Sequence, residues 1–272
     1  MPDENKPRKS NITATQSVLI GSLTGFVETC ITHPLWTIKT KIQQGSPINY
    51  HPKHLFKGFT TNAAGFMPTT AVQLGTNYWI KKHFYSEQPT YIQSINASFA
   101  AGVASSLVSC PVERVMTLQG QAVNHYFAAV TSQQFKQHGI SSFFSGQTAT
   151  ALREGGFSVF FISITPELKK EILPYCINDT IASLISGTIS GIGATLISQP
   201  ADTIKTIQQS SHHKNIGFFK TAKNIYNHKG CSGFFSGTAA RSSNIIVSVT
   251  LMSWMQEQLE KKCENQGSDL SP

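Results

Sequence analysis

Charged residues at fixed distances from a proline recur in this chain, and they are the positions best suited to chemistry. An acid stands two residues after the second and third prolines, and a base stands five residues after the first and third. The positions, copy by copy, are Pro34, Trp36 and Lys39; Pro111, Glu113 and Met116; and Pro200, Asp202 and Lys205. Positions three residues apart share one face of a helix, and a proline inside a helix bends it. The pattern therefore predicts three kinked helices that carry charges for ion pairing.

A second pair of charges, Arg153 and Glu154, interrupts an otherwise uncharged stretch that begins at Gly146. An arginine can bind a carboxylate or a phosphate through two parallel hydrogen bonds. A glutamate beside it can accept hydrogen bonds from an ammonium group or a ribose hydroxyl. The pair predicts either a binding site for a charged solute or two side chains that neutralise neighbouring charges in a cavity wall.

No pattern in the chain predicts an enzyme. His51, His54, His212 and His213 lie in polar links without a cluster of carboxylates, and the sequence contains no nucleophile triad, glycine-rich phosphate loop or zinc spacing. The five cysteines form no C-x-x-C pair, so we expect unpaired thiols, no metal and no cofactor. The net charge is +8, but the lysines are scattered, which fits loops near anionic lipid headgroups better than nucleic-acid binding.

The elements that position these charges form a unit of helix, loop and helix, repeated three times. Two small residues four apart precede each proline, and such pairs let helices approach closely. They are Gly21 and Gly25, Ser98 and Gly102, and Gly187 and Gly191. A second uncharged stretch follows each link and begins at Gly58, Gly146 or Gly237. We expect helices over residues 13–44, 58–84, 91–121, 146–173, 179–209 and 237–262, with short surface helices in the second and third links only.

The composition favours a membrane protein. Only 13% of residues are charged, which is about half the usual share. Residues 58–80, 91–112 and 180–201 contain no Asp, Glu, Lys or Arg, and about 20 helical residues span the hydrocarbon core of a bilayer. Ser, Thr, Gly and Gln in these stretches suit helices that line a wet cavity. The first 15 residues are polar without an apolar core, so we expect no cleavable signal.

Over about residues 15–262 the chain resembles the mitochondrial carrier family. In that family the odd-numbered helices carry Pro-x-(Asp/Glu)-x-x-(Lys/Arg), and the even-numbered helices follow an aromatic-(Lys/Arg)-Gly motif. The resemblance implies an all-α membrane protein with six transmembrane helices in three pseudo-symmetric repeats around a central cavity. The expected parts are a polar N-terminal tail (1–12), repeats at 13–86, 87–174 and 175–263, and a disordered C-terminal tail (264–272).

The resemblance also implies a matrix gate built from the odd helices. The links inside each repeat carry lysines and no acid, which places them on the more negative face, the matrix in carriers. Each acid would meet the base of the next odd helix, so Glu113 would pair with Lys205 and Asp202 with Lys39. Trp36 and Met116 would replace the third ion pair by an apolar contact. Gln43 and Gln209, nine residues after their prolines, belong to the same gate.

A cytoplasmic gate would close the opposite end, and this chain keeps only part of it. Counting from the glycines of the even helices, the acid positions fall on Tyr78, Pro166 and Glu257, and only the last is acidic. Lys81 and Lys169 keep the base positions. We expect this gate to depend on packing more than on charge.

In carriers the substrate contacts lie about two turns past the glycine of each even helix. The corresponding residues are Gly65 and Phe66, Arg153 and Glu154, and Asn244 and Ile245, with Arg241 one turn from Asn244. An Arg-Glu pair at this place resembles carriers of amino-acid-type solutes, including S-adenosylmethionine. Gly65 would leave room for a flat ring beside Phe66, unless Phe66 is core packing. Arg241 would be a second anion contact or a residue of the matrix rim.

The resemblance implies further partners and alternatives. Gly58, Gly146 and Gly237 precede helices whose free amides would bind cardiolipin. The protein would be a monomer and a multi-pass protein of the mitochondrial inner membrane, that of a host cell if the source is a bacterium. A nucleotide transporter of the ATP/ADP type, or a transport-inactive scaffold with the carrier fold, remain the alternatives.

Overall fold

The computed structural model describes residues 14–43, 50–56, 59–85, 89–121, 127–210, 217–235 and 237–268. Within these ranges the side chains at positions 14, 39–43, 120–121, 210, 240 and 260–268 lie outside the description. The described part contains helices and no strand. The predicted all-α class is therefore confirmed.

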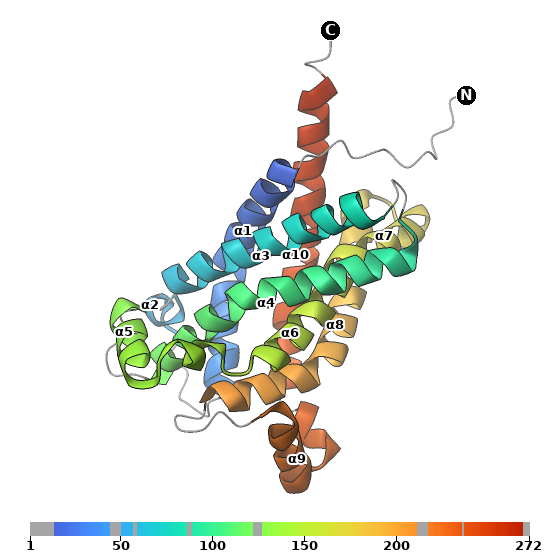
Figure 1. Ribbon diagram of the computed structural model, residues 1–272. Coiled ribbons are helices and arrows are strands. Elements are labelled where there is room, and N and C mark those ends of the chain that lie inside the picture. The colour runs from blue at the N-terminus through green and yellow to red at the C-terminus, as the bar shows by residue number, and fades with distance from the viewer. Residues whose placement is uncertain are drawn as a thin grey trace, which may run out of the picture.

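Six long helical segments form the body of the molecule (Figure 1). The fourth consists of three consecutive pieces, α6, η2 and α7. The segments are α1 (Ala14–Gln43), α3 (Phe59–Phe84), α4 (Tyr91–Gln121), α6 (Gln147–Ser158) with η2 (Val159–Ile164) and α7 (Thr165–Ile172), α8 (Asp179–Ser210), and α10 (Thr238–Ser268). The predicted bounds agree to within one residue except in the last segment, which is longer, and the fourth, which changes character.

The long helices close into a ring. Each packs against its two neighbours in chain order, and α1 packs against α10 to complete the circle. The start of α1 and the end of α10 lie at the same end of the bundle, as an even number of crossings requires (Figure 1). We call this the cytoplasmic end and the opposite end, where the links lie, the matrix end, following the carrier orientation.

Short helices occupy the links at the matrix end. They are α2 (Pro52–Leu55), α5 (Phe127–His138) with the 3-10 helix η1 (Ile140–Phe144), and α9 (Phe218–Lys229) with η4 (Cys231–Phe235). The first link was expected to have lost its surface helix, and it keeps a single turn. A further 3-10 turn, η3 (Leu173–Tyr175), follows α7.

The three motif prolines lie inside continuous helices, as the sequence predicts: Pro34 in α1, Pro111 in α4 and Pro200 in α8. In Figure 1 the orange half of α8 runs at an angle to its yellow half. The small residues before the prolines bring odd and even helices together. A Cβ added at Gly102 would lie 2.3 Å from the carbonyl oxygen of Glu154, and one at Gly191 would lie 2.7 Å from Cα of Ile246.

Burial is inverted relative to a water-soluble bundle. Large apolar side chains face outward, with Leu19 and Ile197 more than 60% exposed, whereas Thr70, Ser105 and Gln199 are buried inside the ring. Of the described helices, three are long and apolar enough to cross a membrane, over Thr15–Ile38, Tyr91–Gln119 and Asp179–Gln209. They belong to the first, third and fifth of the six segments, which are the odd helices.

Two segments differ from the sequence-based expectation. One continuous helix was expected over residues 146–173, but the fourth segment contains the π-helical turn η2, which ends two residues before Pro166. Proline has no backbone N–H to bond to the preceding turn. Thr165 Oγ1 donates a hydrogen bond to the carbonyl of Phe160 there, at 2.7 Å. The C-terminal tail was expected to be disordered from residue 264, but α10 continues to Ser268. Lys, Glu and Gln are good helix formers that extend a helix already nucleated.

Candidate functional site

A cavity of ≈ 690 Å³ lies at the centre of the ring. All six long segments contribute residues to its lining, among them Glu28, Gly65, Glu113, Arg153, Asp202 and Asn244. The odd helices contribute residues near their prolines, and the even helices contribute residues about two turns from their starts. The threefold repeat therefore brings corresponding positions of each unit to one space.

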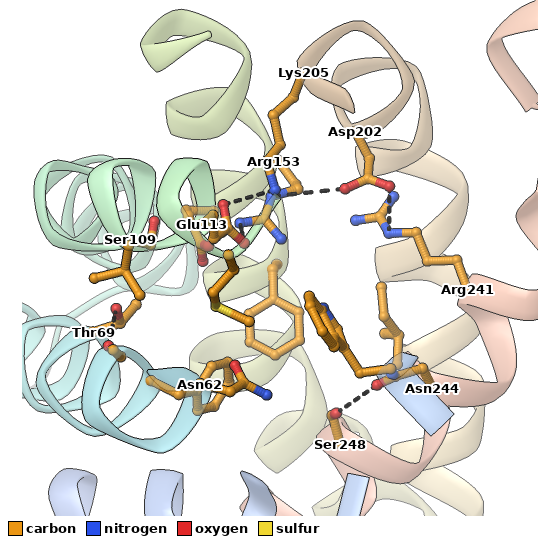
Figure 2. A pocket seen from close by; sticks show the side chains of 18 of the residues that line it. Asn62, Thr69, Ser109, Glu113, Arg153, Asp202, Lys205, Arg241, Asn244 and Ser248 are labelled. Atoms are coloured by element: carbon orange, nitrogen blue, oxygen red, sulfur yellow. Dashed lines mark hydrogen bonds and ion pairs between the residues drawn. The ribbon is translucent and has the colours of Figure 1, made fainter. Parts of the chain in front are cut away.

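Six of the lining charges form one connected network (Figure 2). Arg153 Nη2 lies 2.8 Å from Glu113 Oε1, and Arg153 also pairs with its neighbour Glu154. The same guanidinium lies 3.9 Å from Asp202. Lys205 Nζ is 2.7 Å from Glu113 Oε2, and Arg241 Nε is 3.5 Å from Asp202 Oδ2. We predicted the substrate contacts and the matrix gate as separate sites. In the structure Arg153 contacts residues of both.

The gate residues are placed as follows. Glu113 and Lys205 meet as expected. Asp202 is close to the two arginines of the network, and the side chain of its expected partner Lys39 lies outside the description, as does that of Gln43. Both Trp36 and Met116 line the cavity.

Residues near the gate make further contacts, one within α1 and one between α4 and α8. Trp36 stacks on the buried ring of His33, with centroids 5.7 Å apart. Gln209 is buried, and its backbone carbonyl accepts a hydrogen bond from Arg114, a residue that the sequence analysis did not single out. This bond ties the matrix end of α8 to α4.

The predicted substrate contacts on the fourth and sixth segments are held by hydrogen bonds. Gln73 Nε2 of α3 donates to Glu154 Oε2 at 3.1 Å. The guanidinium of Arg241 donates to Gln199 Oε1 at 3.0 Å and to Ser198 Oγ at 2.8 Å. Arg153 Nε makes no hydrogen bond to any described residue, and it lies buried 3.9 Å from Asp202 Oδ1.

The role expected for Gly65 is wrong in one respect. It lines the cavity, but the space beside it is filled, because a Cβ added there would lie 2.2 Å from Val112 Cγ1 of α4. The missing side chain thus serves helix packing and leaves no slot for a flat ring. Phe66 packs against the apolar cluster that contains Phe161 and Met252, which favours its core role, although it also borders the cavity.

A seventh lining charge, Glu28 of α1, was missed in the sequence. It is 3% exposed and accepts hydrogen bonds from Thr32, at 2.9 Å, and from Ser248 of α10. The signal was present, because Glu28 is the only Asp, Glu, Lys or Arg between residues 10 and 38. The carrier pattern directs attention to even helices for substrate contacts, and Glu28 lies on an odd one.

At the cytoplasmic end Lys169 of α7 pairs with Glu257 of α10, two residues expected in that gate. Lys169 Nζ also lies 3.0 Å from Asp179 Oδ1, at the start of α8, which the sequence analysis did not include. Lys81 lies in the last turn of α3 at the same end.

Gly146 and Gly237 immediately precede α6 and α10, with φ of 82° and 79°. This left-handed backbone explains why both positions are glycine. Gly58 lies outside the described residues. Cardiolipin binding at these glycines stays a prediction. Within the described ranges, no group of three His, Cys, Asp or Glu residues could hold a metal ion.

The threefold ring of proline-containing helices around a charged cavity defines the class of protein. The sequence profile of the family described as mitochondrial carrier protein matches residues 10–54, 87–174 and 178–266. The chain belongs to this family, whose members are multi-pass proteins of the mitochondrial inner membrane, and the predicted fold and localisation are confirmed. It is a transporter by family and not an enzyme.

The individual relatives that match the chain are each about a quarter identical to it. The chain is 27% identical to the mitochondrial glycine transporter of Xenopus laevis over 91% of its own length and 90% of the relative's. It is 26% identical to mitochondrial glycine transporter B of Danio rerio, over 90% and 94%. Identity to the mitochondrial glycine transporter of Homo sapiens is 25%, over 84% and 83%.

Proposed function

We propose that this carrier moves a small amino-acid-type solute across the inner membrane by alternating access. The observation that carries the proposal is the convergence of both charge signs on one central cavity. Among its described lining residues are four acids and three bases: Glu28, Glu113, Glu154 and Asp202 against Arg153, Lys205 and Arg241. A solute with one carboxylate and one ammonium group can pair with both.

The relatives support the same class, because those most similar to this chain include proteins named for glycine transport. The packing around Gly65 favours a small amino acid over S-adenosylmethionine, whose adenine would need the space that Val112 fills. The cavity volume alone does not separate the two. Measuring the uptake of a small amino acid and of S-adenosylmethionine by the same preparation separates them.

The network suggests how binding and opening are coupled. Arg153 bridges Glu113 of α4 and Asp202 of α8, which are both residues of the matrix gate. A solute carboxylate that binds Arg153 competes with these two acids for the same guanidinium. Occupation of the site therefore weakens contacts that hold the matrix end closed, which is the differential interaction that a ligand-driven change requires.

The nucleotide alternative is less well supported. A nucleoside triphosphate carries several negative charges on adjacent groups, and it would have to displace acids from each base of the network. The excess of acids over bases in the described lining opposes this. Uptake of ATP that exceeds that of every amino acid would reverse the preference.

A scaffold without transport activity is the alternative of another class. Against it, ion pairs remain at both ends, between Glu113 and Lys205 and between Lys169 and Glu257. A protein that only binds partners does not need ion pairs that close the two ends of a cavity separately. Partner binding without any flux would favour the scaffold.

The test is uptake into proteoliposomes of labelled glycine, larger neutral amino acids, S-adenosylmethionine and ATP, each with and without internal solute. The Arg153→Ala variant should abolish uptake. Lys170→Ala is the matched control, because Lys170 is an exposed cation of α7 paired only locally with Glu167. The proposal fails if no amino-acid-type compound is taken up, or if both variants behave as the wild type. The same preparation tests the predicted monomer and the cardiolipin requirement.

A further inference from the structure

Glu28 stands apart from the charge network. No lysine or arginine whose side chain is described forms an ion pair with it, although it lines the cavity and is 3% exposed. Its neighbours are neutral donors, Thr32 and Ser248, and both donate to Oε1. The other oxygen, Oε2, accepts no hydrogen bond from the described residues and borders the cavity. A lone carboxylate inside a membrane protein is costly, and such residues commonly mark a binding function.

The position of Glu28 separates it from the arginines. It lies six residues before Pro34, whereas Glu113 and Asp202 lie two residues after their own prolines. Eight helical residues correspond to about 12 Å along the axis. In Figure 2, Ser248 and Asn244 lie on the opposite side of the cavity from Arg153, and Ser248 is the residue that holds Glu28. The cavity therefore has a lone acid on its cytoplasmic side, whereas its described bases all lie in the network of both charge signs on its matrix side.

We propose that Glu28 binds the ammonium group of the solute and makes the carrier select amines against acids that lack one. This inference rests on the proposed function, because it assigns one end of the same amino-acid-type solute. The solute would bind with its carboxylate toward Arg153 and its ammonium group toward Glu28, which both line the cavity. Thr32 and Ser248 orient the Glu28 carboxylate so that Oε2 faces the solute.

A purely structural role for Glu28 makes different predictions. The bond from Ser248 ties α10 to α1, so Glu28 could serve only to join two helices. Glu28→Gln keeps the size of the side chain and its carbonyl oxygen as an acceptor, and removes only the charge. Ser248→Ala removes the tie and keeps the charge. The two variants thus separate binding from packing.

The experiment measures competition for uptake of labelled glycine by unlabelled glycine and by glycolate, which has a hydroxyl group where glycine has its ammonium. The wild type should prefer glycine strongly. Glu28→Gln should reduce that preference by about tenfold or more, since it loses a charge-assisted contact made only to the amine. Glu171→Gln, the same change at an exposed site near the end of α7, should retain the full preference. If the variant transports too slowly, the shifts in unfolding temperature that the same two compounds produce in detergent give the preference.

Three outcomes overturn the inference. If Glu28→Gln keeps the wild-type preference for glycine, Glu28 does not bind the ammonium group. An equal loss for both compounds, matched by Ser248→Ala and by a lower unfolding temperature, assigns Glu28 to packing. A retained preference with a lost response to an imposed pH gradient assigns it to proton binding. If the wild type takes up no amino acid at all, the proposed function itself has failed, and this result is distinct from the other three.

Discussion

The two ends of the cavity are closed in different ways. Toward the matrix, three acids and three bases from four helical segments form one network, and most of them are buried. Toward the cytoplasm, Lys169 pairs with Glu257 and Asp179, whose side chains are 26% and 43% exposed. Charges close to water attract each other weakly, and ion pairs exposed to solvent contribute little to stability. We therefore expect the cytoplasmic closure to be the weaker one.

The difference also concerns what each end does with the solute. Arg153 belongs to both the proposed binding site and the network at the predicted matrix gate, whereas the described contacts of Lys169 involve no cavity residue. We expect the empty carrier to open readily to the cytoplasm and to open to the matrix only when a solute competes for Arg153. The following variants break or sharpen this contrast.

The largest effect should come from Glu113→Gln. The change leaves Lys205 and Arg153 without their shared carboxylate inside the bundle, and breaking one side of a buried pair costs about 3 kcal/mol or more. The state that is closed to the matrix and takes up solute from the cytoplasmic side should become less populated by up to about 100-fold, the equivalent of that energy, and uptake should fall with it. Thermal unfolding in detergent and uptake rates measure the two effects. If both stay within twofold of the wild type, the network does not hold the matrix end.

A smaller effect should follow from restoring the missing third pair with the double variant Trp36→Asp and Met116→Arg. Both residues line the cavity, and an added pair would strengthen the matrix closure. Burying two charges offsets most of their attraction, so we expect little change in unfolding temperature. Uptake should slow by about fivefold, because opening must break one more contact of about 1 kcal/mol. Trp36→Asp alone is the control, and it should destabilise the protein because its charge lacks the new partner.

Some contacts of the site could be predicted from the sequence and others could not, and the double variant tests one of the predicted ones. The pairing of Glu113 with Lys205 was predictable from the resemblance to the carriers, in which each acid meets the base of the next odd helix. The ends of the helices were predictable from the stretches without charged residues and from the glycines that precede the even helices. The contacts of Arg153 and Arg241 with Asp202 were not, since they depend on the rotation of three helices and on long side chains that reach across the cavity.

Two other differences have local causes. Counting from Gly58 places Gly65 at the cavity, but it cannot say that Val112 of another helix fills the space beside it. Asp179 was unpredictable as a partner of Lys169, because it begins α8 and lies ten residues beyond that lysine, outside any repeated motif. Glu28 could have been found from its isolation in an uncharged stretch.

A still smaller effect should come from Lys169→Ala at the cytoplasmic end. The variant removes both partly exposed pairs, and each is worth about 0.5 kcal/mol. The unfolding temperature should fall much less than in Glu113→Gln. Half-saturation for solute added from the cytoplasmic side should improve by up to about fivefold, the equivalent of both pairs, because the state that is open to that side becomes more populated. Lys170→Ala, the neighbouring exposed cation, should change neither quantity. An effect of Lys169→Ala as large as that of Glu113→Gln would contradict the ranking of the two ends.

The smallest effect should come from Asp179→Asn. Asp179 is the more exposed of the two partners of Lys169, and Glu257 remains in place after the change. The pair should therefore contribute about 0.3 kcal/mol, which 0.5 M salt removes by screening. Uptake and unfolding temperature of the variant should match the wild type in high salt and differ slightly in low salt. Glu257→Gln, which removes the more buried partner, should give the larger shift at every salt concentration. If the order of these two variants is reversed, the first turn of α8, and not the contact between α7 and α10, holds the cytoplasmic end.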